Sequence, residues 1–233
     1  LIPLLPIIAR LDGRSFSRFT GNLERPFDKR LSALMLNTTK HLVEETNALI
    51  GYTQSDEISL VMLQTDPRAQ IWFDGKIQKM VSNLAAQASA FFNKNLAVYL
   101  PEKAGSLPTF DCRVWNVPNK EEAVNAILWR EQDATKNSVS MATRHYYSHK
   151  EMENQGRAAM MEMLFKKGVN WNDYPVMFKR GLYIRRIQST GKFTLEELAS
   201  LPEKHAARSN PELMVDRSRV VAVSMPPLGR IIN

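Results

Sequence analysis

The stretch LLPIIARLDGRSF at residues 4–16 and the stretch GYTQSDEISLVML at residues 51–63 decide the fold. The first is an apolar run that ends in Asp12 and Gly13, which is typical of a buried strand followed by a turn. The second has two apolar segments on either side of a Ser-Asp pair, which is typical of two short strands joined by a tight turn. Both stretches therefore predict strands whose ends carry carboxylates.

Helical periodicity and strand patterns extend this interpretation outward. The expected elements are a strand at 4–11, a helix at 28–47, strands at 51–54 and 57–63, a helix at 75–93, a strand at 110–117 and a helix at 120–132. The first six follow the split βαβ order of a ferredoxin-like (βαββαβ) α+β fold. Because its first and third strands are antiparallel neighbours, Asp12 is expected beside Asp56 and Glu57 at one edge of the sheet.

The second part of the chain has a different pattern. Helices are expected at 138–147 and 151–167, followed by a short strand around 177–187 and a loop-rich tail from residue 200. No flexible linker separates the two parts. We therefore expect a catalytic core at 4–133 and a mainly helical basic extension at 134–233, packed together as one integrated unit.

Charge separates the same two parts. The net charge is +7, with 15 Lys/Arg and 15 Asp/Glu up to residue 133, against 16 and 9 from residue 134 onward. This split suits an enzyme that holds cations in its first part and a polyanion in its second, although a solvated basic surface is the alternative.

Composition excludes several classes of protein. Hydrophobic residues make up 44% and charged residues 24%, so extended disorder is excluded, and the apolar stretches are too short to span a membrane. Cys112 is the single cysteine and cannot form an internal disulfide. We therefore expect a soluble cytoplasmic protein in which Cys112 is a small buried hydrophobe. Leu rather than Met stands first, so we expect that residues upstream are missing.

The converging acidic residues predict a magnesium site. Asp12, the carbonyl of Gly13 and Asp56 supply the hard oxygen ligands that Mg²⁺ prefers. Taken alone, Asp12-Gly13 is also typical of an ordinary turn. Two carboxylates in close contact, however, disfavour joint ionisation unless a cation neutralises them. Two Mg²⁺ ions held in this way activate an attacking hydroxyl and stabilise a leaving phosphate. Glu57 has either a catalytic or a structural role.

Basic residues are expected around these carboxylates. Lys76 and Lys79 lie three residues apart at a helix start, where free backbone N–H groups favour phosphate. Arg25 at the start of the first helix and Arg113 on the fourth strand add positive charge. Each of these residues, taken singly, is also an ordinary surface cation.

An ordered set of motifs resembles the tRNA-histidine guanylyltransferases and their relatives, the reverse-direction (3′-to-5′) polymerases. The motifs are RLDGRSF at 10–16, RPFD at 25–28, QSDE at 54–57, GK at 75–76 with Lys79, FDCRV at 110–114, WR at 129–130 with Asp133 and Asn137, QGR at 155–157 and FKRG at 178–181. The resemblance covers residues 6–182.

The resemblance implies a polymerase-palm core and a two-step reaction. ATP activates the 5′-monophosphate of a tRNA, or a 5′-triphosphate is used directly, and the 3′-hydroxyl of GTP or another nucleoside triphosphate then attacks. Asp12, the Gly13 carbonyl and Asp56 resemble the Mg²⁺ ligands, with Glu57 an essential neighbour. The resemblance also implies that nucleotide or phosphate is bound by Arg14, Ser15, Phe16, Arg25, Asp28, Ser55, Lys76, Lys79 and Arg113. It implies that RNA is bound by Asn137, Arg157 and Lys179. The implied partners are the tRNA acceptor stem and further copies in a homotetramer.

One departure from the family pattern bears on the substrate. Eukaryotic histidine-tRNA enzymes carry His-Ile-Asn-Asn-Leu-Tyr-Asn-Thr after the Trp-Arg motif, whereas residues 135–140 read TKNSVS. The departure favours the relatives that use pairing with the opposite strand to repair truncated tRNA 5′ ends. Strict histidine-tRNA guanylate addition is the alternative.

Two further functions compete. A non-catalytic RNA-binding module with this strand order needs aromatic side chains on the first and third strands, and residues 7–11 and 58–62 contain none. A palm-type nucleotide cyclase needs no RNA and leaves the basic second part unexplained.

Overall fold

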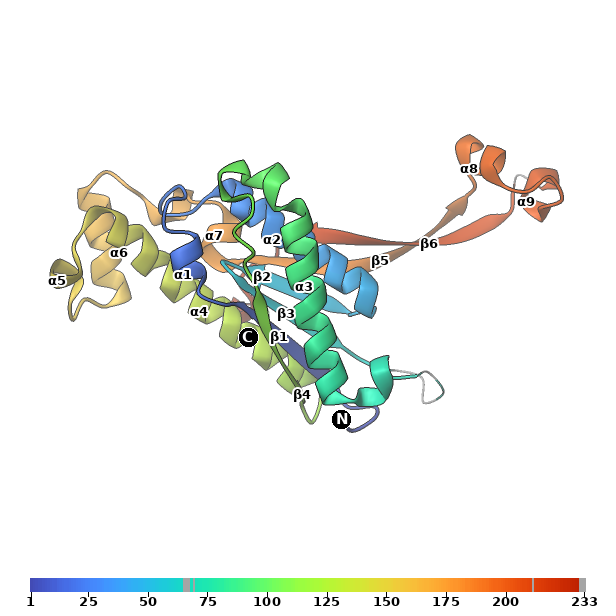
Figure 1. The fold of residues 1–233 in the computed structure, drawn as a ribbon, viewed down its shortest axis with the longest axis horizontal. Coiled ribbons are helices and arrows are strands. Elements are labelled where there is room, and N and C mark those ends of the chain that lie inside the picture. Colours follow the sequence, from blue (N-terminus) through green and yellow to red (C-terminus); the bar gives the residue numbers. More distant parts are fainter. Residues whose placement is uncertain (65–67, 69, 211, 231–233) are drawn as a thin grey trace.

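The computed structural model describes residues 1–64, 68, 70–210 and 212–230 (Figure 1). Its strands are β1 (Ile7–Gly13), β2 (Ile50–Gln54), β3 (Glu57–Met62), β4 (Phe110–Asn116), β5 (Leu182–Lys192) and β6 (Met214–Val223). The helices are α1 (Phe16–Phe19), α2 (Lys29–Thr46), α3 (Ile77–Tyr99), α4 (Lys120–Tyr146), α5 (His149–Met152), α6 (Arg157–Lys166), α7 (Val176–Arg180), α8 (Leu195–Ser200) and α9 (Ala206–Ser209). Short 3₁₀ turns are η1 (Trp72–Gly75), η2 (Pro101–Lys103), η3 (Trp171–Asp173) and η4 (Leu228–Arg230).

The strands form one six-stranded antiparallel sheet in the order β4-β1-β3-β2-β5-β6. As expected, β1 and β3 are antiparallel neighbours, and Asp12 pairs in register with Glu57. On the other side of β1, Asp12 pairs with Asp111 of β4. Three carboxylates from three strands therefore lie in one row across the sheet.

Helices cover both faces of the sheet. Helices α2 and α3 lie on one face and the long α4 lies on the other (Figure 1). Because side chains alternate along a strand, Ala9 and Leu11 of β1 pack with α2 and α3, whereas Ile8 packs with Ile127 of α4. Cys112 is buried, as expected, and burial raises the pKa of its thiol to about 12.

The sequence expectations differ from the structure at several ends. The first strand begins at Ile7 rather than residue 4, because Leu4 has a positive φ of 64° and Pro6 lacks an N–H for the ladder. The helices expected at 120–132 and 138–147 are one continuous helix, α4. The helix expected at 151–167 begins six residues later, at Arg157, with Gly156 as its N-cap.

The expected loop-rich tail is the largest correction. Residues 177–181 are not strand, since Phe178 lies in α7 and β5 begins only after Gly181. The tail contains β6, which pairs with β5 from Tyr183 opposite Val223 to Lys192 opposite Met214. This ribbon extends away from the sheet, with α8 and α9 at its tip (Figure 1). Its half-exposed residues lack a clear buried face, so the alternation that indicates a strand is weak.

Within the described residues, no helix is both long and apolar enough to cross a lipid bilayer.

Candidate active site

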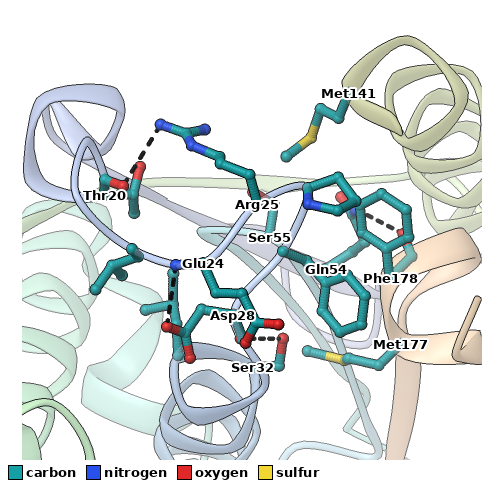
Figure 2. Close-up of a pocket in the computed structure, with 14 residues that line it drawn as sticks. Thr20, Glu24, Arg25, Asp28, Ser32, Gln54, Ser55, Met141, Met177 and Phe178 are labelled. Carbon is teal, nitrogen blue, oxygen red and sulfur yellow. Dashed lines mark hydrogen bonds between the residues drawn. The ribbon is translucent and has the colours of Figure 1, made fainter. Parts of the chain in front are cut away.

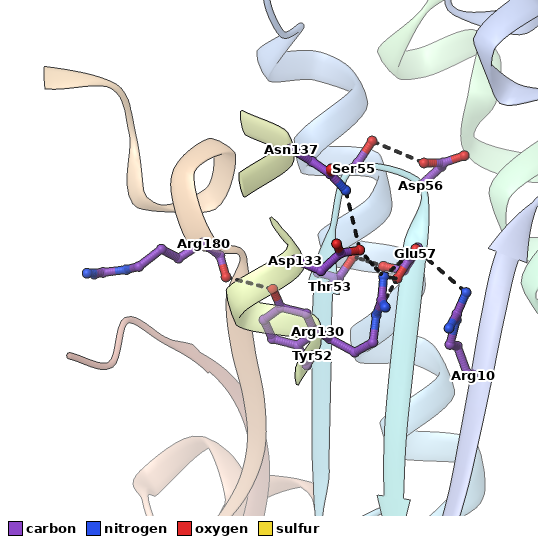
Figure 3. A network of polar contacts seen from close by, with 10 residues as sticks. All are labelled: Arg10, Tyr52, Thr53, Ser55, Asp56, Glu57, Arg130, Asp133, Asn137 and Arg180. Atoms are coloured by element: carbon purple, nitrogen blue, oxygen red, sulfur yellow. Dashed lines mark hydrogen bonds and ion pairs between the residues drawn. The ribbon is translucent and has the colours of Figure 1, made fainter. Parts of the chain in front are cut away.

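The β2–β3 turn brings Asp56 to the end of β1. Ser55 makes the turn with a positive φ of 55°, and the backbone N–H of Gly13 donates to the carbonyl of Asp56 at 3.1 Å. The hydroxyl of Ser55 donates to Asp56 Oδ1 at 3.0 Å (Figure 3). Backbone pairing therefore fixes Asp12 and Asp56 at the same sheet edge, and Ser55 orients the second carboxylate.

Glycine is required at position 13 for steric reasons. A Cβ atom there would lie 2.4 Å from the ring of Phe16, which is buried against Phe92 and Phe110. The Phe16 ring thus belongs to the core beneath the site and is not accessible to a nucleotide. Arg14 and Ser15, by contrast, are exposed at this edge.

Electrostatics at the edge favour a cation. Burial raises the pKa of Asp56, and the nearby charges of Asp12 and Glu57 raise it further. Within the described part of the chain, no Lys, Arg or His forms an ion pair with Asp12 or Asp56. Two neighbouring carboxylates without a basic partner fit a divalent cation, because its charge would offset their repulsion.

The donor set is small. Among the residues that the structure describes, no group of three or more His, Cys, Asp or Glu side chains is placed to hold a metal ion. A site here would therefore rely on the carboxylates of Asp12 and Asp56, together with backbone oxygen such as the Gly13 carbonyl and water, which is a donor set that suits Mg²⁺.

Glu57 is held differently from its neighbour Asp56. Arg130 of α4 donates through Nε to Glu57 Oε2 at 2.9 Å and through Nη2 to Oε1 at 2.8 Å (Figure 3). Arg10 lies 3.8 Å from the same carboxylate. Both oxygens of Glu57 are therefore committed to a basic partner, so its geometry corresponds to the structural role.

A pocket lies on the other side of the β2–β3 turn (Figure 2). Arg25, Asp28 and Ser55 line it, and Arg25 Nη2 lies 3.5 Å from the carbonyl of Thr20. Asp28 is buried and caps α2, and its two carboxylate oxygens accept from Arg30 at 3.1 and 2.8 Å. The Arg30 guanidinium holds the pKa of Asp28 below its usual range. Arg25 and Ser55 are thus available to a ligand, whereas the Asp28 carboxylate stabilises the pocket wall.

Lys76 and Lys79 lie at the N-terminal end of α3, away from the Asp12 edge, which corrects the expectation that they surround the carboxylates. The C-terminal end of α3 reaches the Asp28 side, where Glu102 of η2 pairs with Arg30. Lys76 caps the other end of α3, whereas the Asp12 edge lies level with Ser89, because Phe110, opposite Gly13 in register, donates to Ser89 Oγ at 3.0 Å. The ten residues from Lys79 to Ser89, at 1.5 Å each, correspond to about 15 Å along the helix. Sequence reasoning placed both at a helix start correctly but could not orient the helix.

Arg113 does lie on the same sheet face as Asp12. It pairs with Arg10 in the β1–β4 register, two residues from Asp111, which is opposite Asp12. Its guanidinium is exposed and lies 3.9 Å from Asp111. It is thus the expected cation nearest in register to the carboxylate row.

Two of the three residues expected to bind RNA line pockets, and the third, Lys179, lies against Trp171 at the wall of one of them. Asn137 lines a polar pocket with Asp56 and Arg130, between the β2–β3 turn and α4. Arg157 lines a separate pocket on the other side of α4, together with Trp171. Lys179 lies over the Trp171 ring, 5.5 Å from its centroid, and donates to the carbonyl of Asn172.

Residue-by-residue reasoning missed the roles of Arg130 and Arg144. Both line the polar pocket beside Asp56, but they lie on α4, more than seventy residues from that turn in the sequence. The available signal was the i,i+3 spacing of Arg130 and Asp133, which form an ion pair at 3.0 Å. That spacing indicates a local pair and does not reveal the contact with Glu57.

Known proteins resemble this chain in sequence and in fold. The sequence model of the family described as Thg1, tRNAHis guanylyltransferase, matches residues 1–118. A tRNA(His) guanylyltransferase from Neurospora crassa is 29% identical over 203 residues, covering 80% of this chain and 68% of that protein. A bacterial tRNA(HIS) guanylyltransferase (Thg1)-like protein in complex with ATP has a TM-score of 0.76 at 36% identity, covering 79% of this chain and 81% of that one. A bacterial Thg1-like protein in complex with GTP has a TM-score of 0.75 at 29% identity, covering 100% of this chain and 88% of that one. Because the family model matches half of the chain and the fold matches solved members, the chain belongs to the tRNAHis guanylyltransferase family of nucleotidyltransferases.

Proposed function

We propose that this protein is a Mg²⁺-dependent nucleotidyltransferase that adds nucleotides to the 5′ end of tRNA. The observation that carries the proposal is the juxtaposition of Asp12 and Asp56, held by the contact between Gly13 and the Asp56 carbonyl. The names of the similar proteins, and the ATP and GTP bound in the two solved structures, support tRNA and nucleoside triphosphates as substrates.

The reaction has two balanced steps. In the first, a 5′-phosphate oxygen of the tRNA attacks the α-phosphorus of ATP, a new P–O bond forms and pyrophosphate leaves. In the second, the 3′-hydroxyl oxygen of the incoming nucleotide attacks the 5′-phosphorus, AMP leaves and the hydroxyl proton passes to water. A 5′-triphosphate enters at the second step and releases pyrophosphate.

The residues at the edge have distinct tasks in these steps. Asp12, Asp56 and the Gly13 carbonyl would hold Mg²⁺, which offsets charge on the reacting phosphates and favours ionisation of the attacking hydroxyl. Ser55 keeps the Asp56 carboxylate oriented, and Arg25 in the adjacent pocket binds phosphate oxygens of a nucleotide. Exposed Arg14 and Arg113 add positive charge for the RNA backbone.

The substrate we favour is a tRNA with a truncated 5′ end, repaired by pairing with the opposite strand. Residues 135–140 read TKNSVS and lie inside α4 beside the polar pocket, where only Asn137 matches the histidine-tRNA motif. This difference supports templated repair over strict addition of guanylate to histidine tRNA.

The proposed architecture is a polymerase palm. The order β4-β1-β3-β2 with α2 and α3 on one face is the ferredoxin-like arrangement, which supports a palm-like core at 4–133. The extension at 134–233 contributes β5, which pairs with β2 and supports one integrated unit. A cytoplasmic homotetramer is part of the same proposal.

The test is an extension assay with two tRNAs. The protein is incubated with Mg²⁺, ATP, labelled nucleoside triphosphates and either intact histidine tRNA or a tRNA that lacks its 5′ nucleotide. We expect extension of the truncated tRNA according to the opposite base. Untemplated guanylate on histidine tRNA would indicate the maturation enzyme instead. Failure to extend either tRNA, with release of a cyclic nucleotide in the absence of RNA, would replace the proposal with a cyclase.

A further inference from the structure

Arg130 links the long helix α4 to the turn that carries Asp56. Its guanidinium contacts both oxygens of Glu57, the first residue of β3, and Asp56 is the residue directly before it. The two side chains are only about a fifth to a quarter exposed, at 21% and 24%. A forked contact of this kind fixes orientation as well as distance, because two parallel N–H donors meet two acceptor oxygens.

The surrounding network holds Arg130 itself in place. Asp133, one turn along α4, accepts from Arg130 Nη2 at 3.0 Å, and Asn137 lies 3.4 Å from the same Asp133 oxygen (Figure 3). Arg10 of β1 lies on the other side of Glu57. Two arginines face two carboxylates in this cluster, so its charges balance without an external ion.

The position of the cluster suggests its purpose. Asp56 has no basic partner among the described residues, and its backbone carbonyl is bonded to Gly13, next to Asp12. The Asp56 carboxylate must nevertheless stay close to Asp12, against their mutual repulsion. The hydrogen bonds that Asp56 itself accepts come from Gly13 and Ser55, both within the sheet edge. Its flanking residues connect the turn to other elements, because Gln54 donates to the Phe178 carbonyl of α7 at 3.2 Å and Glu57 accepts the fork of Arg130 from α4.

We propose that Arg130 is a positioning residue: through Glu57 it fixes the β2–β3 turn and thereby keeps Asp56 in place to share a divalent cation with Asp12. The effect of Arg130 on catalysis rests on the proposed function, whereas its effect on cation binding does not. Glu57 transmits the constraint and is not itself a metal ligand. Arg130→Lys conserves the charge and removes the fork, so it separates geometry from electrostatics.

The experiment measures Mn²⁺ affinity by electron paramagnetic resonance of the full chain without tRNA, alongside the single-turnover rate of 5′ extension. We expect R130K to bind Mn²⁺ about tenfold more weakly and to extend tRNA ten- to a hundredfold more slowly. Displacement of a ligand by about 1 Å has effects of this size. The KM for the nucleoside triphosphate changes less than kcat. Thermal unfolding identifies any variant that fails to fold.

A charge-balanced double variant provides the decisive comparison. E57Q removes a negative charge near the metal and also weakens the fork, whereas E57Q/R130Q removes the fork together with one charge of each sign. If Arg130 positions the turn, the double variant binds Mn²⁺ about as weakly as R130K does. If only net charge matters, it recovers wild-type affinity and the proposal is overturned.

The matched control is R217K. Arg217 of β6 makes the same kind of forked pair with Glu197 of α8, which lies at the tip of the β5–β6 ribbon, far from the Asp12 edge (Figure 1). R217K should leave Mn²⁺ affinity unchanged, and wild-type affinity in R130K would refute the positioning role. If the wild-type protein binds Mn²⁺ but extends no tRNA, while R130K binds it weakly, the positioning role holds and the proposed function fails.

Discussion

The carboxylates of Asp12 and Asp56 and those of Glu57 and Asp133 lie at the same end of the sheet. Arg130 contacts both members of the second pair and Arg10 reaches Glu57, whereas no basic residue in the described structure pairs with the first pair. Asp56 and Glu57 are adjacent in sequence, yet one points into the uncompensated edge and the other into a balanced cluster (Figure 3).

This contrast distinguishes scaffold from chemistry. A buried or half-buried carboxylate with a forked arginine partner is already stabilised, and removing the partner leaves an uncompensated charge. Two adjacent carboxylates without a partner are unfavourable unless something positive arrives. We therefore interpret the cluster around Glu57 and Arg130 as structural support, and the edge at Asp12 and Asp56 as the place where a cation and phosphates bind.

The largest effect is expected from neutralising the uncompensated edge. D12N or D56N should slow single-turnover 5′ extension at least about a thousandfold, because several kcal/mol of charge stabilisation is lost and each 1.36 kcal/mol is tenfold. D111N provides the matched control, since Asp111 lies opposite Asp12 in the sheet but is exposed beside Arg113. Equal losses of extension rate in D111N and D12N would contradict the distinction between the carboxylates that bind the cation and those that do not.

A smaller effect is expected at the glycine beneath the edge. G13A places a methyl group 2.4 Å from the buried Phe16 ring, so the site must shift, at a cost of about 1–3 kcal/mol in the free energy of unfolding. Urea denaturation measures it. G156A is the control, because a Cβ atom there meets nothing within 4 Å and only the N-cap preference changes, by less than about 1 kcal/mol. If the two variants are equally stable, Gly13 is not constrained by packing.

The compensated pair in the pocket wall predicts a pH dependence. The Arg30 guanidinium lowers the pKa of Asp28, so the pair stabilises the folded protein above the ordinary carboxyl pKa, and this stabilisation is lost as the pH falls below about 4. D28N keeps a capping side chain but loses the ion pair. We expect it to be less stable by about 1 kcal/mol at pH 7, a modest value because Arg30 is half exposed, and the difference should close towards pH 3. A difference that is constant with pH contradicts this origin.

The smallest effect is expected at the far end of α3. K76A/K79A should change the Mn²⁺ affinity of the Asp12 edge by less than about twofold, because Lys79 lies about 15 Å along α3 from the level of that edge, roughly twice the Debye length at physiological salt. The same resonance titration measures it. A tenfold change would mean that these lysines approach the carboxylates, for instance from a second copy of the chain.

Much of the core could be predicted from local patterns. The apolar run before Asp12 and the Ser-Asp turn are local signals, and the strand-helix order then places Asp12 opposite Glu57, as the register confirms. The start of α2 at an Asp cap is likewise a local signal. These features depend on residues close together in sequence and on a small number of allowed topologies.

The remaining features depend on tertiary contacts that no local pattern carries. Arg130 reaches Glu57 across 73 positions, and the position of Lys76 depends on which way α3 crosses the sheet. The β6 strand is stabilised by its pairing with β5 in an exposed ribbon, so its side chains show little of the alternation on which strand prediction relies. Phe16, which lies within the family motif, packs in the core.

The most direct test of the account is to locate the cation. A crystal of the protein soaked with Mn²⁺ and ATP would give anomalous difference density for the metal. We expect a peak between the carboxylates of Asp12 and Asp56, with the Gly13 carbonyl among its ligands and Glu57 still paired with Arg130. A peak coordinated by Glu57 with Arg130 displaced, or an edge without metal at saturating Mn²⁺, would contradict it.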